Sequence, residues 1–149
     1  MKLLMTDMKL DGAFPLPPIK GSNLLVPITT WVEMFHETQI TGVEFDEFWY
    51  EKVEEGVAYF FKWHGKPRAT VLVVWDEEGP THIECRTLGD LFISEIEGVS
   101  IRAEVVKLFC NAGFWSGKSI NYTNGYMNKS CSGLHKRKTY DKTQQRLYN

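Results

Sequence analysis

His82 and Glu84 have side chains that could move a proton to or from a substrate. One residue separates them in the segment 81–87, which has the composition of a β-strand, so both lie on one face of that strand. A histidine beside a carboxylate can act as a general base. The solvent-exposed face of an antiparallel sheet gives the same alternation and is the simpler interpretation. His82 and Glu84 are therefore catalytic candidates only if the chain is an enzyme.

The histidines and cysteines do not have the spacing of a metal site. The four histidines and three cysteines are scattered, and no two cysteines are separated by only two residues, so we expect no bound metal. Cys110 falls on the apolar stripe of an expected helix and is more simply a small core residue than a nucleophile. The odd cysteine count, with no secretory leader at the start, favours a reducing cytoplasm. No apolar run approaches the roughly 20 residues of a membrane span, so we expect no membrane insertion.

Two helices are expected before the central part of the chain. Thr30 and Glu33 have the spacing of a capping box, and Gly42 is a suitable stop, which predicts a helix between them. Apolar residues recur at helical spacing over 45–53 and predict a second helix that ends near Gly56. These helices would cover a sheet formed by the segments that follow.

The period of the sequence then changes to that of β-strands. Residues 57–63 and 69–75 are rich in β-branched and aromatic side chains and predict a hairpin, and residues 81–87 predict a third strand. Trp63 flanks the hairpin turn, and we expect it to be exposed for a partner. The expected fold class is α+β, with a central, mostly antiparallel sheet flanked by helices.

The rest of the expected frame follows the third strand. We expect a short helix over 89–96, a short strand over 98–101, a helix over 102–111 and an edge strand over 120–123. Ahead of the first helix, the proline-rich segment 14–21 is expected to be extended, because proline fixes its own φ angle and restricts the residue before it. A rigid spacer is the simpler interpretation of that segment, and a peptide ligand of the PxxP type is the alternative.

The two ends of the chain differ strongly in charge. Residues 1–115 contain 10 basic and 18 acidic side chains, whereas residues 116–149 contain seven basic side chains and one acidic, which gives net charges of −8 and +6. We therefore expect a core domain over 1–115 and a basic, aromatic-bearing extension over 116–149. Its cations could neutralise phosphates or meet an acidic protein, and its rings could stack on bases. The alternative is a solubilising tail, or one that packs on the acidic core. The candidate partner-binding residues there are Lys136, Arg137, Lys138 and Tyr140.

Three stretches resemble the GNAT family of acyl-CoA-dependent N-acyltransferases. The hairpin over 57–75 resembles the central strands of that family, and residues 86–91 (Arg-Thr-Leu-Gly-Asp-Leu) resemble its pyrophosphate loop. Residues 108–114 (Leu-Phe-Cys-Asn-Ala-Gly-Phe) resemble the end of its last helix. The resemblance implies a GNAT-like fold, an acyl-CoA cofactor and a base on the third strand.

The resemblance also assigns roles to individual residues. It implies that Arg86 and Gly89 bind the pyrophosphate of coenzyme A, with Glu84 or His82 as the base. The chain departs from the family at two of its motif positions. Leu91 replaces a glycine or alanine at the end of the loop, and Phe109 stands where the family has a proton-donating tyrosine.

These departures favour a small non-enzymatic binding or accessory protein on a GNAT-like frame. Its partner would be a protein, or a nucleic acid bound by the basic extension, and it would need no cofactor. Its small size, high aromatic content and lack of a complete motif are typical of a protein encoded by a phage or other mobile element, which would place it in the host cytoplasm. The alternatives are an N-acyltransferase that uses acetyl-CoA or another acyl-CoA, and a nucleic-acid-binding protein that works through its extension.

Overall fold

A computed structural model describes residues 12–114, 117 and 119–123 of the chain. These residues form an α+β fold with a mostly antiparallel sheet, as the sequence predicts, and the sheet is open and has six strands. In the described part of the chain, no helix is both long enough and apolar enough to cross a membrane. The elements, in chain order, are β1 (Leu25–Pro27), α1 (Trp31–Thr41), α2 (Glu47–Glu54), β2 (Ala58–Trp63), β3 (Ala69–Asp76), β4 (Gly79–Thr87), β5 (Leu91–Phe92), α3 (Val99–Asn111) and β6 (Asn121–Thr123).

Three antiparallel strands form the centre of the sheet. Strands β2 and β3 are the predicted hairpin, and β4 continues the meander against β3. In this register Leu72 lies opposite Glu84 and Thr70 lies opposite Arg86, so these four side chains share one face. Strand β1 pairs with the other side of β2. Strand β4 is held in place by its pairing with β3 along most of its length.

Local capping sets the limits of the first two helices. The Thr30 hydroxyl accepts a hydrogen bond from the Glu33 N–H, and Gly42 ends α1 with a φ of 82°. The Glu33 carboxylate accepts from the N–H of Thr29, one residue before the position that a capping box would use. The Asp46 carboxylate caps α2 in the same way, by accepting from the Trp49 N–H. The two predicted helices are confirmed, with these capping interactions at their starts.

The connection from β4 to α3 differs from the prediction at two points. The expected helix over 89–96 is wrong, because Gly89 and Asp90 adopt φ angles of 78° and 61° and turn the chain into β5. The expected strand over 98–101 is also wrong, because α3 begins at Val99. Gly98 is needed there for close packing, since a Cβ atom at this position would lie 2.0 Å from the Tyr122 hydroxyl.

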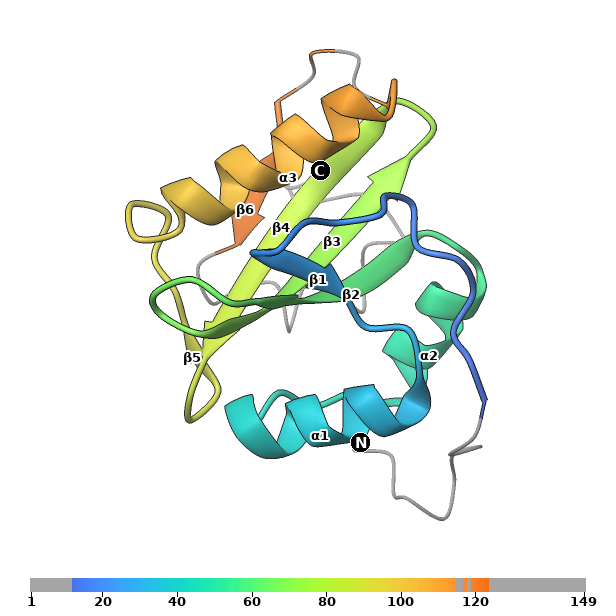
Figure 1. Cartoon of the computed structure of the whole chain (residues 1–149), viewed down its shortest axis with the longest axis vertical. Coiled ribbons are helices and arrows are strands. Elements are labelled where there is room, and N and C mark those ends of the chain that lie inside the picture. Colours follow the sequence, from blue (N-terminus) through green and yellow to red (C-terminus); the bar gives the residue numbers. More distant parts are fainter. Residues whose placement is uncertain (1–11, 115–116, 118, 124–149) are drawn as a thin grey trace.

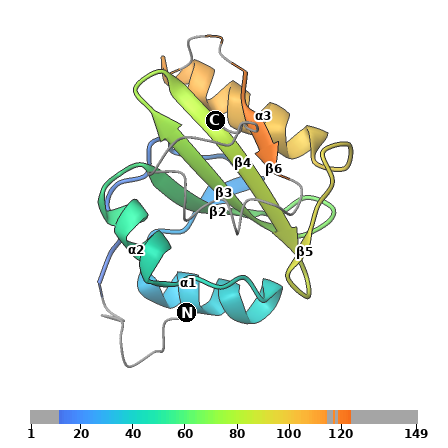
Figure 2. The same ribbon diagram turned by 180° about the vertical axis from the view of Figure 1, so that it is seen from behind.

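The helices cover the two faces of the sheet. Helix α3 crosses one face, and α1 and α2 lie toward the other (Figures 1 and 2). The buried side of α3 carries Ile101, Val105 and Phe109, spaced four residues apart. On the opposite face, Phe60 of β2 packs against Phe45 and Trp49. Apolar side chains therefore pack against both faces of the sheet.

Strand β6 belongs to this sheet although it lies beyond residue 115. It pairs in parallel with β4, with His82 opposite Asn121 and Glu84 opposite Thr123. Ile120, just before it, is buried in the core. The order β4, α3, β6 is thus a crossover between two parallel strands. The sheet extends into the region that the sequence assigns to the extension 116–149.

Candidate functional site

A row of polar side chains lies on one face of β4. His82, Glu84 and Arg86 alternate with Ile83 and Cys85, which are fully buried on the opposite face. The structure therefore brings the predicted catalytic candidates and the predicted cofactor-binding arginine onto one face, as their spacing requires.

Arg86 is held between two carboxylates. Its Nε donates to Glu84 Oε2 at 2.9 Å, and its terminal Nη1 donates to Asp90 Oδ1 at 2.7 Å. The guanidinium also lies 4.4 Å from the centre of the Phe92 ring, within cation–π range. Two negative charges and an aromatic face thus surround one positive charge, so this arginine already has its partners inside the protein.

Glu84 is buried, with 7% of its surface exposed. Burial raises the pKa of its carboxyl, and the neighbouring Arg86 opposes that rise only in part. Its second oxygen, Oε1, is buried and has no hydrogen-bond partner in the described part of the chain. Glu84 thus has one oxygen bonded to Arg86 and one buried oxygen that the described residues leave unsatisfied.

The substitution E84Q should change the pH dependence of stability. In the folded protein the pKa of Glu84 lies above its ordinary value of 4.5, so its contribution to stability is complete below about pH 4.5. That contribution is lost as the pH rises through the folded-state pKa. We expect the wild type to lose stability relative to E84Q by up to about 1.4 kcal/mol per pH unit in this window. Urea unfolding of both proteins at several pH values measures the difference, and parallel pH profiles would contradict the expectation.

Gly89 lies in a tight turn and not at the start of a helix. The next N–H, that of Asp90, donates to the carbonyl oxygens of Thr41 at 2.7 Å and Thr87 at 3.1 Å. The chain then enters β5, and α3 begins only at Val99. A pyrophosphate cradle needs free N–H groups at a helix start. In the described residues, Arg86 and Gly89 do not form one together.

His82 lies further along the same face of β4. Its Nδ1 is 3.2 Å from the Thr81 hydroxyl, and its Nε2 is 3.4 Å from the Asn121 amide nitrogen. Its neighbours are therefore polar groups of β4 and β6. On the opposite face of β4, burial raises the pKa of the Cys85 thiol to about 12 and keeps it protonated.

Two expectations about exposure are wrong. Trp63 is only 4% exposed, because Leu25 of β1 pairs beside it and its indole lies over Gly65 in the turn. The expectation that it is exposed for a partner is thus corrected. Cys110 is exposed, since it is one residue past the buried stripe that ends at Phe109. The predicted tail residues Lys136, Arg137, Lys138 and Tyr140 lie outside the described residues.

A second polar cluster joins α1 to β3 and was not found from the sequence. The carboxylate of Glu37 accepts two hydrogen bonds from the Arg68 guanidinium and one from the Thr70 hydroxyl, at 2.6 Å. The Thr41 hydroxyl lies 2.8 Å from that of Thr70. Glu37 fell on a helix and Arg68 in a turn, and nothing in their sequence spacing connects them. The cluster fixes α1 against the sheet close to the turn at Asp90.

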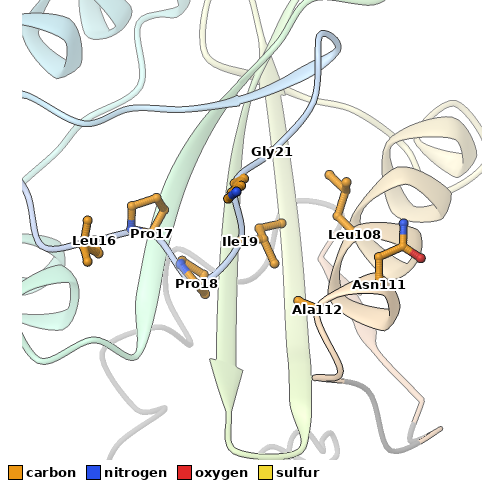
Figure 3. A pocket seen from close by; sticks show the side chains of 9 residues that line it. Leu16, Pro17, Pro18, Ile19, Gly21, Leu108, Asn111 and Ala112 are labelled. Carbon is orange, nitrogen blue, oxygen red and sulfur yellow. The ribbon is translucent and has the colours of Figure 1, made fainter.

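An apolar groove lies between the proline-rich segment and the end of α3. Its volume is about 560 Å³. Figure 3 shows the segment on one side and α3 on the other. Leu16 is 91% exposed and Ile19 is buried, so the groove has an open rim and an apolar floor. The lining residues are Leu16, Pro17, Pro18, Ile19, Lys20, Gly21, Leu108, Asn111 and Ala112.

Across residues 12–114 and the described positions after them, no three His, Cys, Asp or Glu side chains are placed to hold a metal ion. No family model matches the chain, and neither a curated protein nor a solved structure does.

Proposed function

We propose that this chain is a small protein-binding protein that acts without catalysis. Its contact surface is the groove between residues 16–21 and α3, and its partner contributes an apolar segment. The observation that carries this proposal is Leu16, a large apolar side chain that is almost fully exposed beside a groove lined by proline, isoleucine and leucine. Exposed apolar surface next to a concave site is typical of protein contact surfaces.

The groove is preformed, which favours binding. Proline rings fix φ in the segment, so little conformational entropy is lost when a partner binds. The segment is also tied to the core, since the Tyr59 hydroxyl donates to the Pro15 carbonyl at 2.9 Å. The Phe14 N–H donates to the Thr29 carbonyl at 2.8 Å. These bonds hold one wall of the groove in place before a partner arrives.

Features of β4 and α3 support a role without catalysis. The charge of Arg86 is matched by Glu84 and Asp90, so a coenzyme A pyrophosphate would have to displace them. Phe109 is fully buried and has no proton to donate. Acyl transfer on this frame would therefore need groups other than the ones that the family resemblance assigns.

Variants in the groove test this function. The tagged protein is used to capture partners from cells that produce it, and the captured proteins are quantified by mass spectrometry. Leu16→Asp and Ala112→Asp each place a charge in the groove and should reduce the partner at least about tenfold, since burying an unpaired charge costs several kcal/mol. Ile40→Asp is the matched control, because Ile40 is exposed on α1 outside the groove.

The same capture experiment separates this proposal from binding through the basic extension. Nuclease treatment, and the replacement of Lys136, Arg137 and Lys138 by alanine, should leave the captured protein unchanged. The groove proposal is wrong if the groove variants retain the same proteins as Ile40→Asp. Loss of capture only on nuclease treatment would indicate nucleic-acid binding instead.

A further inference from the structure

A second groove runs along a different side of α3. Its volume is about 660 Å³, and α3 supplies Val99, Arg102 and Val106, with Ser119 from the connection to β6 opposite. These three helix residues share one face of α3, because they are three and four positions apart. Leu108 and Ala112, which line the proline-rich groove, lie on another face. The two grooves therefore flank the same helix.

Arg102 lies in this groove, and the residues that the structure describes give it no partner. Of the three arginines in the part of the chain that the structure describes, Arg68 and Arg86 bind carboxylates. Arg102 forms no ion pair there, and its Nε–H group is buried with no hydrogen-bond acceptor. A buried donor without an acceptor costs folding free energy. Because the Nε is closed to solvent, an acceptor from outside the chain would bind the terminal nitrogens of the guanidinium, which are not among the buried atoms.

The nearest carboxylate on α3 does not supply that acceptor. Glu104 is bonded to Lys107, at 3.1 Å between Nζ and Oε1, and to the Ser22 side chain. Lys107 also lines the groove, and its side chain is mostly exposed. Within the described residues, the groove thus presents the guanidinium of Arg102 without an ion pair, and the exposed ammonium group of Lys107. The partner of Lys107 is Glu104, which is also bonded to Ser22.

The groove walls limit what can bind there. A guanidinium presents parallel N–H groups that match the two oxygens of a carboxylate. Val99, Ala103 and Val106 supply apolar surface beside it. Residues 1–115 carry a net charge of −8, which disfavours a long polyanion such as a nucleic acid. A single carboxylate next to apolar groups matches the guanidinium, packs on the apolar surface and meets less repulsion than a polyanion would.

We propose that this groove binds an acidic residue, Asp or Glu, that lies between apolar residues in a segment of the protein partner. The inference rests on the proposed function, since it names a feature of the same partner. Arg102 would bind the carboxylate, and the flanking apolar side chains would pack on Val99 and Val106. The guanidinium of Arg102 would give this groove a selectivity for carboxylates.

Peptide titration tests the inference on the full chain. The probes are acetyl-Leu-Glu-Leu-amide and its neutral counterpart acetyl-Leu-Gln-Leu-amide, and the signal is the Arg102 Nε–H resonance in ¹⁵N NMR. We expect a saturable shift with the glutamate peptide and at least about tenfold weaker binding of the glutamine peptide, because only the former makes a charge-assisted bond. Equal binding of the two peptides would overturn the inference.

Variants of Arg102 give a second readout. R102M, followed by backbone amide shifts, should lose binding of the glutamate peptide without a lower melting temperature than the wild type, because the removed Nε–H has no acceptor among the described residues. The matched control is K66M, in an exposed turn, which should change neither. A large drop in melting temperature for R102M would show a structural role instead, and unchanged peptide binding would exclude the site.

Two further results separate this inference from its rivals. If sodium phosphate displaces the glutamate peptide at lower concentration than sodium acetate, the site prefers phosphate and the inference is wrong. Leu16→Asp should leave peptide binding unchanged, because Leu16 lies in the other groove. If the Arg102 tests fail but partner capture still depends on Leu16, this inference alone is wrong and the proposed function stands.

Discussion

Phe109→Ala should lower the free energy of unfolding by about 3–5 kcal/mol, the usual cost of removing a large aromatic side chain from a core. Phe109 lies on the buried side of α3, and the centroid of its ring is 5.8 Å from that of Phe114. The loss would include both the transfer of the ring from water and the cavity that remains. Urea unfolding followed by circular dichroism measures the change.

The adjacent residue provides the control for this substitution. Cys110→Ala alters the same turn of α3 at an exposed position, so it should change stability by less than about 0.5 kcal/mol. Equal effects at positions 109 and 110 would mean that the buried side of α3 is not the one described here. Because both grooves are built on α3, Phe109→Ala should also weaken partner capture at temperatures where the helix separates from the sheet.

Glu37→Ala should lower the free energy of unfolding by about 3 kcal/mol. Glu37 is 1% exposed, and its removal would take away the carboxylate that accepts hydrogen bonds from both the Arg68 guanidinium and the Thr70 hydroxyl. Breaking a buried ion pair in this way typically costs 3–5 kcal/mol, and the partial exposure of Arg68 places this pair at about the lower limit. The measurement is again urea unfolding, at neutral pH.

A surface pair serves as the reference for Glu37. Glu55→Ala removes the exposed pair with Lys52 and should change stability by less than about 1 kcal/mol. If Glu37→Ala cost no more than Glu55→Ala, the cluster at α1 would contribute nothing beyond a surface contact. High salt should weaken the Glu55 pair more than the Glu37 cluster, since screening acts mainly on exposed charges.

The parts of the fold that depend on neighbouring residues were predictable from the sequence. The cap at Thr30, the stop at Gly42 and the hairpin of β2 and β3 each follow from side chains within a few positions of one another. The three polar residues of β4 share a face because alternation is a property of any strand. These features therefore needed no knowledge of distant contacts.

The features that the sequence missed depend on distant contacts. Residues 98–101 alternate as a strand would, but the Tyr122 hydroxyl occupies the space beside Gly98 and the segment starts α3. Trp63 is buried because Leu25 of β1, which lies 38 positions earlier in the chain, pairs beside it. The acceptors of Arg86 could not be assigned, because Asp90 reaches it only through a left-handed turn.

The apolar groove was partly visible in the sequence. The proline-rich segment was expected to be extended, and its role as one wall of a groove needed the position of α3. The groove at Arg102 left no sequence signal, since an arginine on a helix is usually solvated. Its significance comes from the absence of a carboxylate within reach among the described residues.

The strands at the margins of the sheet are short. Strand β1 has three residues, one of them Pro27, which has no N–H to offer, and β5 has only two. In the described part of the chain, few main-chain groups are thus open to an incoming strand, and edge-to-edge association of copies is disfavoured. Contacts with a partner are then left to exposed side chains such as Leu16. The specificity of partner binding then depends on these side chains, and single substitutions can change it without disturbing the sheet.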